Sequence, residues 1–318
     1  MNINLIALIV SSTLIYSAPL IYTSLGGVFS ERSGTVNVGL EGIMVMGAFS
    51  AVLTNLTLAD KLGGATPWVS LLVAALVGGI FSLIHAVATV NLRADHVISG
   101  TVLNLVAPAL GVFLTRFLFN GVGQTSIIKE SFGYYKFPIL ADIPIIGQIF
   151  FNRTSLPAYV GLLIAVLSWF IIYKTKFGLR LRSVGEHPQA ADTLGINVYK
   201  MKYIGIIISG ILGGIGGGVL AQSISMNFSH VTVAGQGFIA MAAMIFGKWN
   251  PIGAVLAALF FGFAQSLAVV GSQIPLISEI PSIYLQIAPY ILTIIVLVGF
   301  VGQINGPAAG GKTYIKSK

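Results

Sequence analysis

Few side chains in this sequence could do chemistry in an apolar environment, and Glu41 is the most prominent of them. It is the one Asp, Glu, Lys or Arg in the apolar stretch 36–58. A carboxylate is costly to bury in a membrane, so such a residue is usually partnered or functional. Asn37 precedes Glu41 by four residues, which predicts that both lie on one face of a helix. Two interpretations remain open: Glu41 lies on a substrate pathway, or it holds the preceding loop through Arg32.

Asn104 is a second candidate for contact with a polar substrate. It lies one helical turn from Gly100 and from Pro108, within an apolar stretch. A proline inside a membrane helix frees a backbone carbonyl, which a neighbouring side chain or water must satisfy. Hydrogen bonding between helices and contact with substrate are therefore both open for Asn104.

A break in the apolar pattern near residue 235 predicts a third set of pathway residues. Gly235 and Gly237 flank Gln236, which indicates an irregular segment followed by a short helix from Gln236. Irregular backbone at membrane depth persists only where protein or water covers it, and such breaks commonly border transport sites. His230 precedes the break and Phe238 follows it, so both are candidate pathway residues. A plain kink is the alternative.

The polar stretch 178–197 predicts a docking helix. Pro188 suits the first turn of a short helix and Gly195 suits its end. Two helical turns are not stable alone in water, so this helix needs a partner. The residues expected to contact that partner are Ala190, Ala191 and Leu194. The other residues assigned to the docking loop are Arg182, Glu186, His187 and Asp192.

The chain as a whole is too apolar for a water-soluble enzyme. Of its 318 residues, 17 are Lys or Arg and 9 are Asp or Glu, so 8% are charged, against about 25% in soluble domains. The apolar fraction of 56% also excludes a disordered chain. The absence of cysteine excludes disulfides, zinc–thiolate sites and thiol nucleophiles. We expect no catalytic residue, metal or cofactor in this chain.

Long uncharged runs predict an all-helical membrane protein with nine spans. A helix needs about 20 mostly apolar residues to cross a bilayer, and each run is long enough for one span. The seventh span is the weakest because glycines break it, so we expect a broken or re-entrant segment there. The predicted spans are 3–25, 36–58, 67–90, 97–119, 156–174, 203–222, 229–247, 251–271 and 283–302.

Basic residues predict which side each loop occupies, because they favour the cytoplasmic side of short loops. With nine spans, the N-terminus is expected outside and the C-terminus in the cytoplasm. The net charge of +8 then needs no nucleic acid to explain it. The cytoplasmic set is Arg32, Arg93, Lys174, Lys176, Arg180, Arg182, Lys200, Lys202, Lys248, Lys312, Lys316 and Lys318, and the external set is Lys61, Arg116, Lys129, Lys136 and Arg153.

Two polar segments interrupt what we expect to be a single transmembrane domain, residues 1–318. The segment 120–155 is expected outside, and the loop 175–202 in the cytoplasm. At the C-terminus, 306–313 matches the spacing of a phosphate-binding loop, but that chemistry requires a preceding strand and a following helix. A membrane span precedes this motif, so we expect a flexible basic tail.

Glycines spaced four apart predict a close helix crossing. Gly210, Gly214 and Gly218 lie on the sixth span, and small residues let membrane helices approach closely. Packing within the subunit is favoured over a contact between subunits, and a ligand path along this face is the alternative.

Several segments resemble one family of transport proteins. The stretches 29–42, 93–100 and 246–251 resemble the permease subunits of ABC importers, in the branch for ribose, branched-chain amino acids and nucleosides. The 178–197 loop is similar to the coupling helix of these permeases. The resemblance covers about residues 20–300 and is strongest to the shorter permease of bacterial nucleoside importers. The 120–155 segment is its least typical part.

The resemblance implies a multi-pass permease of the bacterial plasma membrane that carries nucleosides, with purine nucleosides preferred. It implies a second, different permease, an ABC ATPase that uses ATP and Mg, and an external lipoprotein that captures substrate. A simple-sugar permease is the alternative, because similar polar groups suit both cargoes. A secondary transporter should show inverted repeats and buried ion sites, and a membrane enzyme should show clustered His, Asp or Glu. The sequence displays neither pattern.

Overall fold

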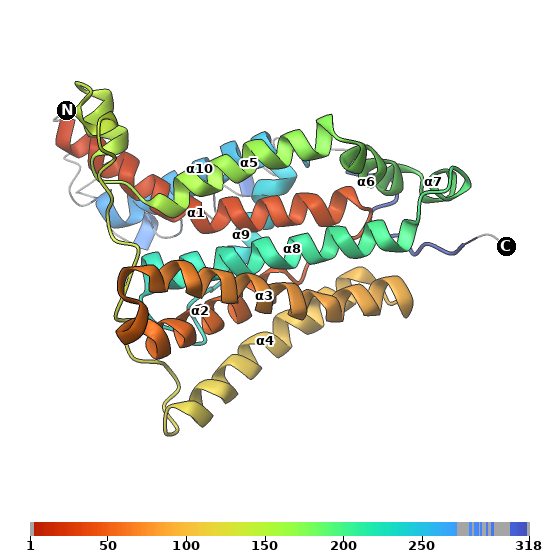
Figure 1. Ribbon diagram of the computed structural model, residues 1–318, viewed down its shortest axis with the longest axis horizontal. Coiled ribbons are helices and arrows are strands. Elements are labelled where there is room, and N and C mark those ends of the chain that lie inside the picture. The colour runs from red at the N-terminus through yellow and green to blue at the C-terminus, as the bar shows by residue number, and fades with distance from the viewer. Residues whose placement is uncertain are drawn as a thin grey trace.

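A computed structural model describes residues 3–271, residues 306–316, and residues 280, 281, 283–285, 287, 291, 294 and 295 between them. All regular secondary structure in this part of the chain is helical, which confirms the all-α prediction. The helices form an elongated bundle with the N-terminus at one end and the C-terminus at the other (Figure 1). The predicted ninth span, 283–302, falls mainly outside the described residues.

Four helices form the N-terminal half of the bundle. The turn Gly63–Ala65 joins the second helix to the third, and a π-helical turn, Val87–Asn91, follows the third. Asp95 starts the fourth helix, because its carboxylate accepts the backbone N–H groups of Val97 (2.8 Å) and Ile98 (3.0 Å). These helices are α1 (Ile3–Arg32), α2 (Leu40–Leu62), α3 (Thr66–Ala86) and α4 (His96–Leu118).

The second half mixes long and short helices. The helix after the predicted break begins at Gln236, as expected, and Gly235 before it has a positive φ of 88°. With 11 residues it rises only about 16 Å, roughly half the hydrocarbon core of a bilayer. The helices are α5 (Leu156–Lys174), α6 (Lys176–Glu186), α7 (Pro188–Thr193), α8 (Val198–Leu220), α9 (Gln236–Phe246) and α10 (Pro251–Val270), and a π-helical turn, Ala221–Ser225, extends α8.

Six helical stretches among the described residues are long and apolar enough to cross a membrane. One of them, Leu40–Asn91, contains both α2 and α3, which fold back on each other after the turn between them (Figure 1). The other five are α1, α4, α5, α8 with its π-helical extension, and α10. These helices overlap the predicted spans, although α1 continues to Arg32.

The α8 helix forms the centre of the bundle, against α1, α2 and α3 (Figure 1). A methyl group at Gly214 would lie 2.2 Å from the carbonyl oxygen of Ala74 on α3, and one at Gly217 would lie 2.0 Å from that of Met44 on α2. Both distances are far inside van der Waals contact. The predicted close crossing within the subunit is therefore confirmed: the glycines allow backbone to touch backbone.

The 120–155 segment runs along one end of the bundle from α4 to α5 (Figure 1). It is pinned at several points. The side-chain amide of Asn55 on α2 donates to the carbonyl of Glu130 (2.6 Å), and the backbone N–H of Thr125 donates to the carbonyl of Phe228 (2.9 Å). Lys129 forms an exposed ion pair with Asp60.

The C-terminal segment differs from its prediction. Residues 306–316 do not form a free basic tail but pack against α6, α7 and α8. Ala309 and Tyr314 are buried there. The prediction of a flexible tail rested on the membrane span before the motif and did not consider these apolar side chains, which hold the segment against the bundle.

Candidate functional site

The carboxylate of Glu41 connects the first turn of α2 to the start of α9. It accepts the backbone N–H of Gly235 at 2.6 Å and that of Gly237 at 2.7 Å. The first N–H groups of a helix have no partner within the helix, and the helix dipole favours a negative charge beside them. Glu41 therefore caps α9 from a different helix.

The predicted contact between Glu41 and Arg32 is wrong. The Arg32 guanidinium donates instead to the carbonyl oxygens of Trp249 (2.9 Å) and Lys248 (3.2 Å). Arg32 ends α1, whereas the Glu41 carboxylate turns toward the glycines before α9. Arg32 thus holds the connection between α9 and α10, whereas Glu41 holds the start of α9.

Both glycines at the break are required by geometry. Gly235 has a left-handed backbone, which glycine adopts at little cost. A Cβ at Gly237 would lie 2.5 Å from the Cα of Glu41, so no side chain fits there. Close approach to Glu41 explains why Gly-Gln-Gly opens α9.

Asn37 does not share a helical face with Glu41, because α2 begins only at Leu40. The residues before it form a largely buried, non-helical segment, 33–39, in which Val36 and Val38 are half-buried. Gly34 has a φ of 80° there. The side-chain amide of Asn37 donates to the hydroxyl of Ser209 on α8 at 3.0 Å, and its oxygen has no hydrogen-bond partner among the described residues.

Side chains from α3 and α4 satisfy the backbone of this buried segment. One ring nitrogen of His85 lies 3.0 Å from the carbonyl oxygen of Val36, and the backbone N–H of Val36 donates to Nδ1 of His96 at 3.2 Å. Non-helical backbone at membrane depth requires such partners. The sequence reasoning missed this role of the two histidines, since 49 and 60 residues separate them from Val36.

Asn104 also binds this region with both ends of its amide. Its oxygen accepts the N–H of Gly42 at 2.8 Å, and its nitrogen donates to the carbonyl of Val38 at 2.9 Å. Of the two interpretations, these contacts favour hydrogen bonding between elements. Asn104 on α4 thus holds the start of α2, and Glu41 in the first turn of α2 holds the start of α9.

The remaining pathway candidates are more accessible. Gln236 exchanges two hydrogen bonds with Gln265 on α10, at 3.3 and 3.1 Å. Phe238, the residue directly after the capped Gly237, is 46% exposed. His230 is exposed on the irregular segment and makes none of the side-chain hydrogen bonds found in the described part of the chain. The sequence reasoning did not identify Gln265, which the α9–α10 packing brings to Gln236.

The short helix of the docking loop is present, and Gly195 after it has a φ of 79°. Leu194 is 81% exposed, and Ala190 is exposed beside it. Ala191, however, is only 2% exposed and packs with Val184 and Tyr314. Its assignment as a docking contact is therefore wrong, because this face of α7 rests on the protein's own chain.

Two charged residues of the docking loop have partners within the chain. Arg182 donates to the carbonyl of Ile172 (3.2 Å) and lies 5.0 Å from the ring centre of Tyr173. The carboxylate of Glu186 accepts the N–H of Ala308 at 3.2 Å. The other loop residues, His187 and Asp192, stay exposed and half-buried, respectively.

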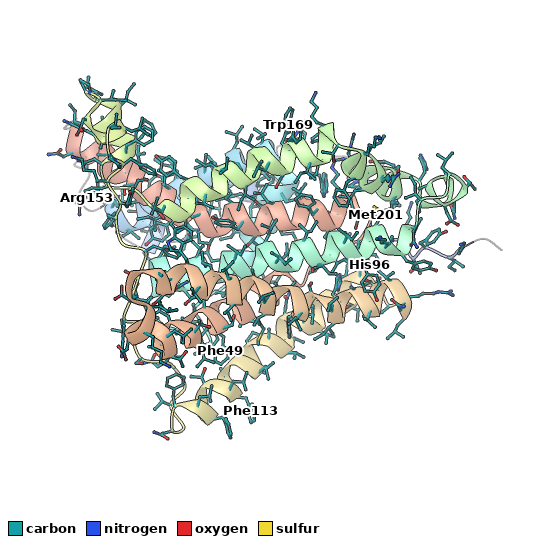
Figure 2. The ribbon with its side chains drawn as sticks, in the orientation of Figure 1. Phe49, His96, Phe113, Arg153, Trp169 and Met201 are labelled. Atoms are coloured by element: carbon teal, nitrogen blue, oxygen red, sulfur yellow. The ribbon has the colours of Figure 1, made fainter. Side chains whose placement is uncertain are left out.

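This end of the bundle carries a further buried contact that sequence reasoning missed. The indole N–H of Trp249 donates to the carboxylate of Glu31 at 2.5 Å. Trp249 lies two residues before α10, and Glu31 lies in the last turn of α1. The pair therefore links the ends of these two helices, although 218 residues separate Glu31 from Trp249 in the sequence. Figure 2 shows His96 and Met201 toward this end and Arg153 at the opposite end.

The fold defines a helical membrane protein whose helices are interrupted at two places and whose polar loop presents a short helix. Residues 9–301 match the family of permease components of the branched-chain amino acid transport system, and the chain belongs to this family. It is therefore a multi-pass protein of the bacterial plasma membrane and a transport component rather than an enzyme.

Three relatives narrow the comparison. The chain is 62% identical over 316 residues to the nucleoside ABC transporter permease NupC of Lactococcus lactis, with 99% of both chains covered. It is 55% identical to the guanosine ABC transporter permease NupQ of Bacillus subtilis, again over 99% of both. A second guanosine permease of that organism, NupP, is 28% identical over 91% of this chain and 80% of its own length.

Proposed function

We propose that this chain is the permease subunit of an ATP-driven ABC importer for nucleosides. The 62% identity to a nucleoside permease over nearly the whole length of both proteins carries this conclusion. Purine nucleosides are the proposed cargo, which a second relative, the guanosine permease NupQ, supports. A permease of this kind uses no cofactor of its own, and ATP with Mg is used by the partner ATPase.

The translocation path is proposed to form between this chain and a second, different permease. The likeness of the chain to both guanosine permeases of one organism supports such a pair. An external lipoprotein would deliver substrate to the outer end of the pair, and an ABC ATPase would bind its cytoplasmic end.

The proposed pathway residues surround the Glu41 cap. Phe238, directly after the capped Gly237, offers an exposed aromatic face, and Gln236, between the two capped glycines, carries the amide that pairs with Gln265. A nucleobase has a π-face and polar edges, so a ring and amides suit it. Asn37, whose amide oxygen has no partner in the described residues, is a further candidate, with Asn104 and His230.

The chain is proposed to cross the membrane in nine passes, which include α9 with the irregular segment before it and the predicted span 283–302, as a single domain with the N-terminus outside. The segment 120–155 would then lie outside and the loop 175–202 in the cytoplasm. The bias of basic residues supports this orientation. The ATPase would dock on Ala190 of α7 and on Leu194 directly after this helix, because these apolar side chains otherwise face water.

The function is tested by uptake of labelled guanosine, ribose and glucose into cells with and without the gene. We expect gene-dependent uptake of guanosine that an excess of other purine nucleosides inhibits. Uptake of a sugar instead of guanosine would favour the simple-sugar permease. Guanosine uptake that persists with an ATPase partner unable to hydrolyse ATP would favour a secondary transporter.

A further inference from the structure

Residues 306–316 are attached to the docking loop through their backbone. The N–H of Ala309 donates to the carbonyl of Gly185 at 2.9 Å, and the N–H of Ala308 donates to the Glu186 carboxylate at 3.2 Å. Both acceptors lie at the end of α6, directly before α7. In Figure 1 the segment lies at the end of α8, beside α6 and α7.

Tyr314 anchors the far part of the segment. Its ring is 6% exposed and meets the ring of Tyr199 edge to face, with centres 5.5 Å apart. It shares one apolar cluster with Val184 of α6 and Ala191 of α7. The next residue, Ile315, is 57% exposed. Tyr314 is therefore the large side chain that this segment buries, while its neighbour faces water.

A buried lysine provides a third attachment. Lys202 on α8 is only 3% exposed, and its ammonium group donates to the carbonyl of Lys312 at 3.3 Å. Burying an ammonium group is costly unless it is hydrogen-bonded. The carbonyl of the C-terminal segment thus stabilises a charge at the start of the central helix.

The segment also borders both sides of α7. A cleft of about 280 Å³ between α7 and α8 is lined in part by Asp192 and Lys316. A second cleft, of about 240 Å³, is lined in part by Pro188, Lys312 and Thr313. Any protein that docks on α7 would therefore meet the segment beside it.

We propose that residues 306–316, the C-terminal strap, are a positioning element that holds the coupling helix α7 against α6 and α8. A six-residue helix does not persist by itself, and the strap covers the side of α7 that carries Ala191. Held in this way, α7 transmits a push on Leu194 to the central helix α8. The inference rests on the proposed function of α7 in ATPase docking.

The absence of cysteine from the chain allows a direct test. The substitution Ala191→Cys places a thiol under the strap, and its rate of reaction with a maleimide reports opening. In the full-length, detergent-solubilised chain, Tyr314→Ala should raise this rate by about tenfold or more, because the state in which the strap is detached becomes more populated. Tyr314→Leu should raise it less.

Two controls accompany the labelling. Ile315→Ala, on the exposed neighbour, should leave the rate unchanged, and Tyr314→Phe, which keeps the ring, should do the same. If Ala191→Cys reacts with maleimide at the same rate with and without Tyr314→Ala and Tyr314→Leu, the proposed role of the strap is overturned. An equal rise in Ile315→Ala would also overturn it, since the effect would not depend on the buried ring.

A second measurement separates the strap from the proposed function. In the reconstituted importer with its ATPase, Tyr314→Ala should reduce nucleoside transported per ATP hydrolysed several-fold, and Ile315→Ala should not. Faster labelling with an unchanged transport ratio would overturn the positioning role. Failure of the ATPase to bind the unmodified chain would contradict the proposed function but leave the labelling result intact.

Discussion

The Glu41 carboxylate accepts two backbone N–H groups that belong to another helix. Hydrogen bonds to a charged acceptor are roughly twice as strong as neutral ones, and a buried N–H left without a partner costs about 1–3 kcal/mol. A residue that attracts attention as an intramembrane charge is thus first a connection between α2 and α9. The same carboxylate lies beside Phe238, which belongs to the proposed pathway.

Replacing Glu41 with Gln should therefore destabilise the protein. The two N–H groups bond different oxygens of the carboxylate, so Gln would set its NH2 group against one of these donors and would lack the charge that favours a helix N-terminus. We expect a loss of about 1–3 kcal/mol, seen as a lower unfolding temperature of the detergent-purified chain. Glu130→Gln is the control, because that carboxylate makes no hydrogen bond within the described residues. Equal unfolding temperatures for both variants would contradict the capping role.

Phe238 tests the pathway at the same scale. Its ring is 46% exposed, so Phe238→Ala should leave the unfolding temperature nearly unchanged. Stacking of a nucleobase on an aromatic ring contributes about 1–3 kcal/mol, so nucleoside uptake should fall roughly tenfold. Phe117→Ala, on an α4 ring that is 76% exposed, should alter neither quantity. Normal uptake in Phe238→Ala would remove this residue from the pathway.

At the scale of elements, the glycines of α8 let the neighbouring helices approach its backbone closely. Alanine is normally about 1 kcal/mol better than glycine inside a helix, yet a methyl group at Gly214 would meet the Ala74 carbonyl at 2.2 Å. We expect the clash to prevail, with a net cost on the order of 1–3 kcal/mol for Gly214→Ala. Gly64→Ala, where nothing lies within 4 Å, is the matched control. The readout is the yield and thermal stability of the complex, and a stabilised Gly214→Ala would refute the packing.

The α7 helix carries the next prediction. Leu194 is 81% exposed, so Leu194→Asp should not disturb the fold of the chain but should weaken ATPase docking. Truncating a buried interface anchor commonly costs about 2 kcal/mol or more, so affinity for the ATPase should drop about thirtyfold. Gln189→Asp adds the same charge within α7, five residues away, without removing an apolar side chain. If Leu194→Asp binds the ATPase with unchanged affinity, the ATPase docks elsewhere on the chain.

The elements also show what the sequence can predict. Uncharged runs located the long helices because membrane crossing requires length and apolarity, and Pro188 and Gly195 bounded α7 because each favours one end of a helix. Spacing failed for Asn37 and Glu41, since the segment 33–39 is held out of a helix by His85 and His96, which lie far along the chain. Ala191 was misassigned because a two-turn helix gives no signal of which face rests on its own protein.

At the scale of the whole molecule, α8 joins two ends that are held differently. At one end, Asn55 on α2 and Phe228 after α8 hold the 120–155 segment through hydrogen bonds. At the other end, the Glu31–Trp249 hydrogen bond links α1 to the start of α10, and the C-terminal strap binds α6 and α8. Between these ends, α8 approaches the backbone of α2 at Gly217 and that of α3 at Gly214, so one closely packed helix connects the two ends.

This arrangement predicts on which side of the membrane each end of the bundle lies. Under the proposed orientation, which the positive-inside bias supports, α7 lies in the cytoplasm and the 120–155 segment outside. In the cysteine-free chain, Gly123→Cys on that segment should react with a membrane-impermeant thiol reagent in intact cells. Leu194→Cys, although its native side chain is 81% exposed, should react only after the cells are permeabilised. Gly123 has nothing within 4 Å of an added Cβ, so the substitution itself should be tolerated. Labelling of Leu194→Cys in intact cells would reverse the orientation and with it the side on which an ATPase could bind.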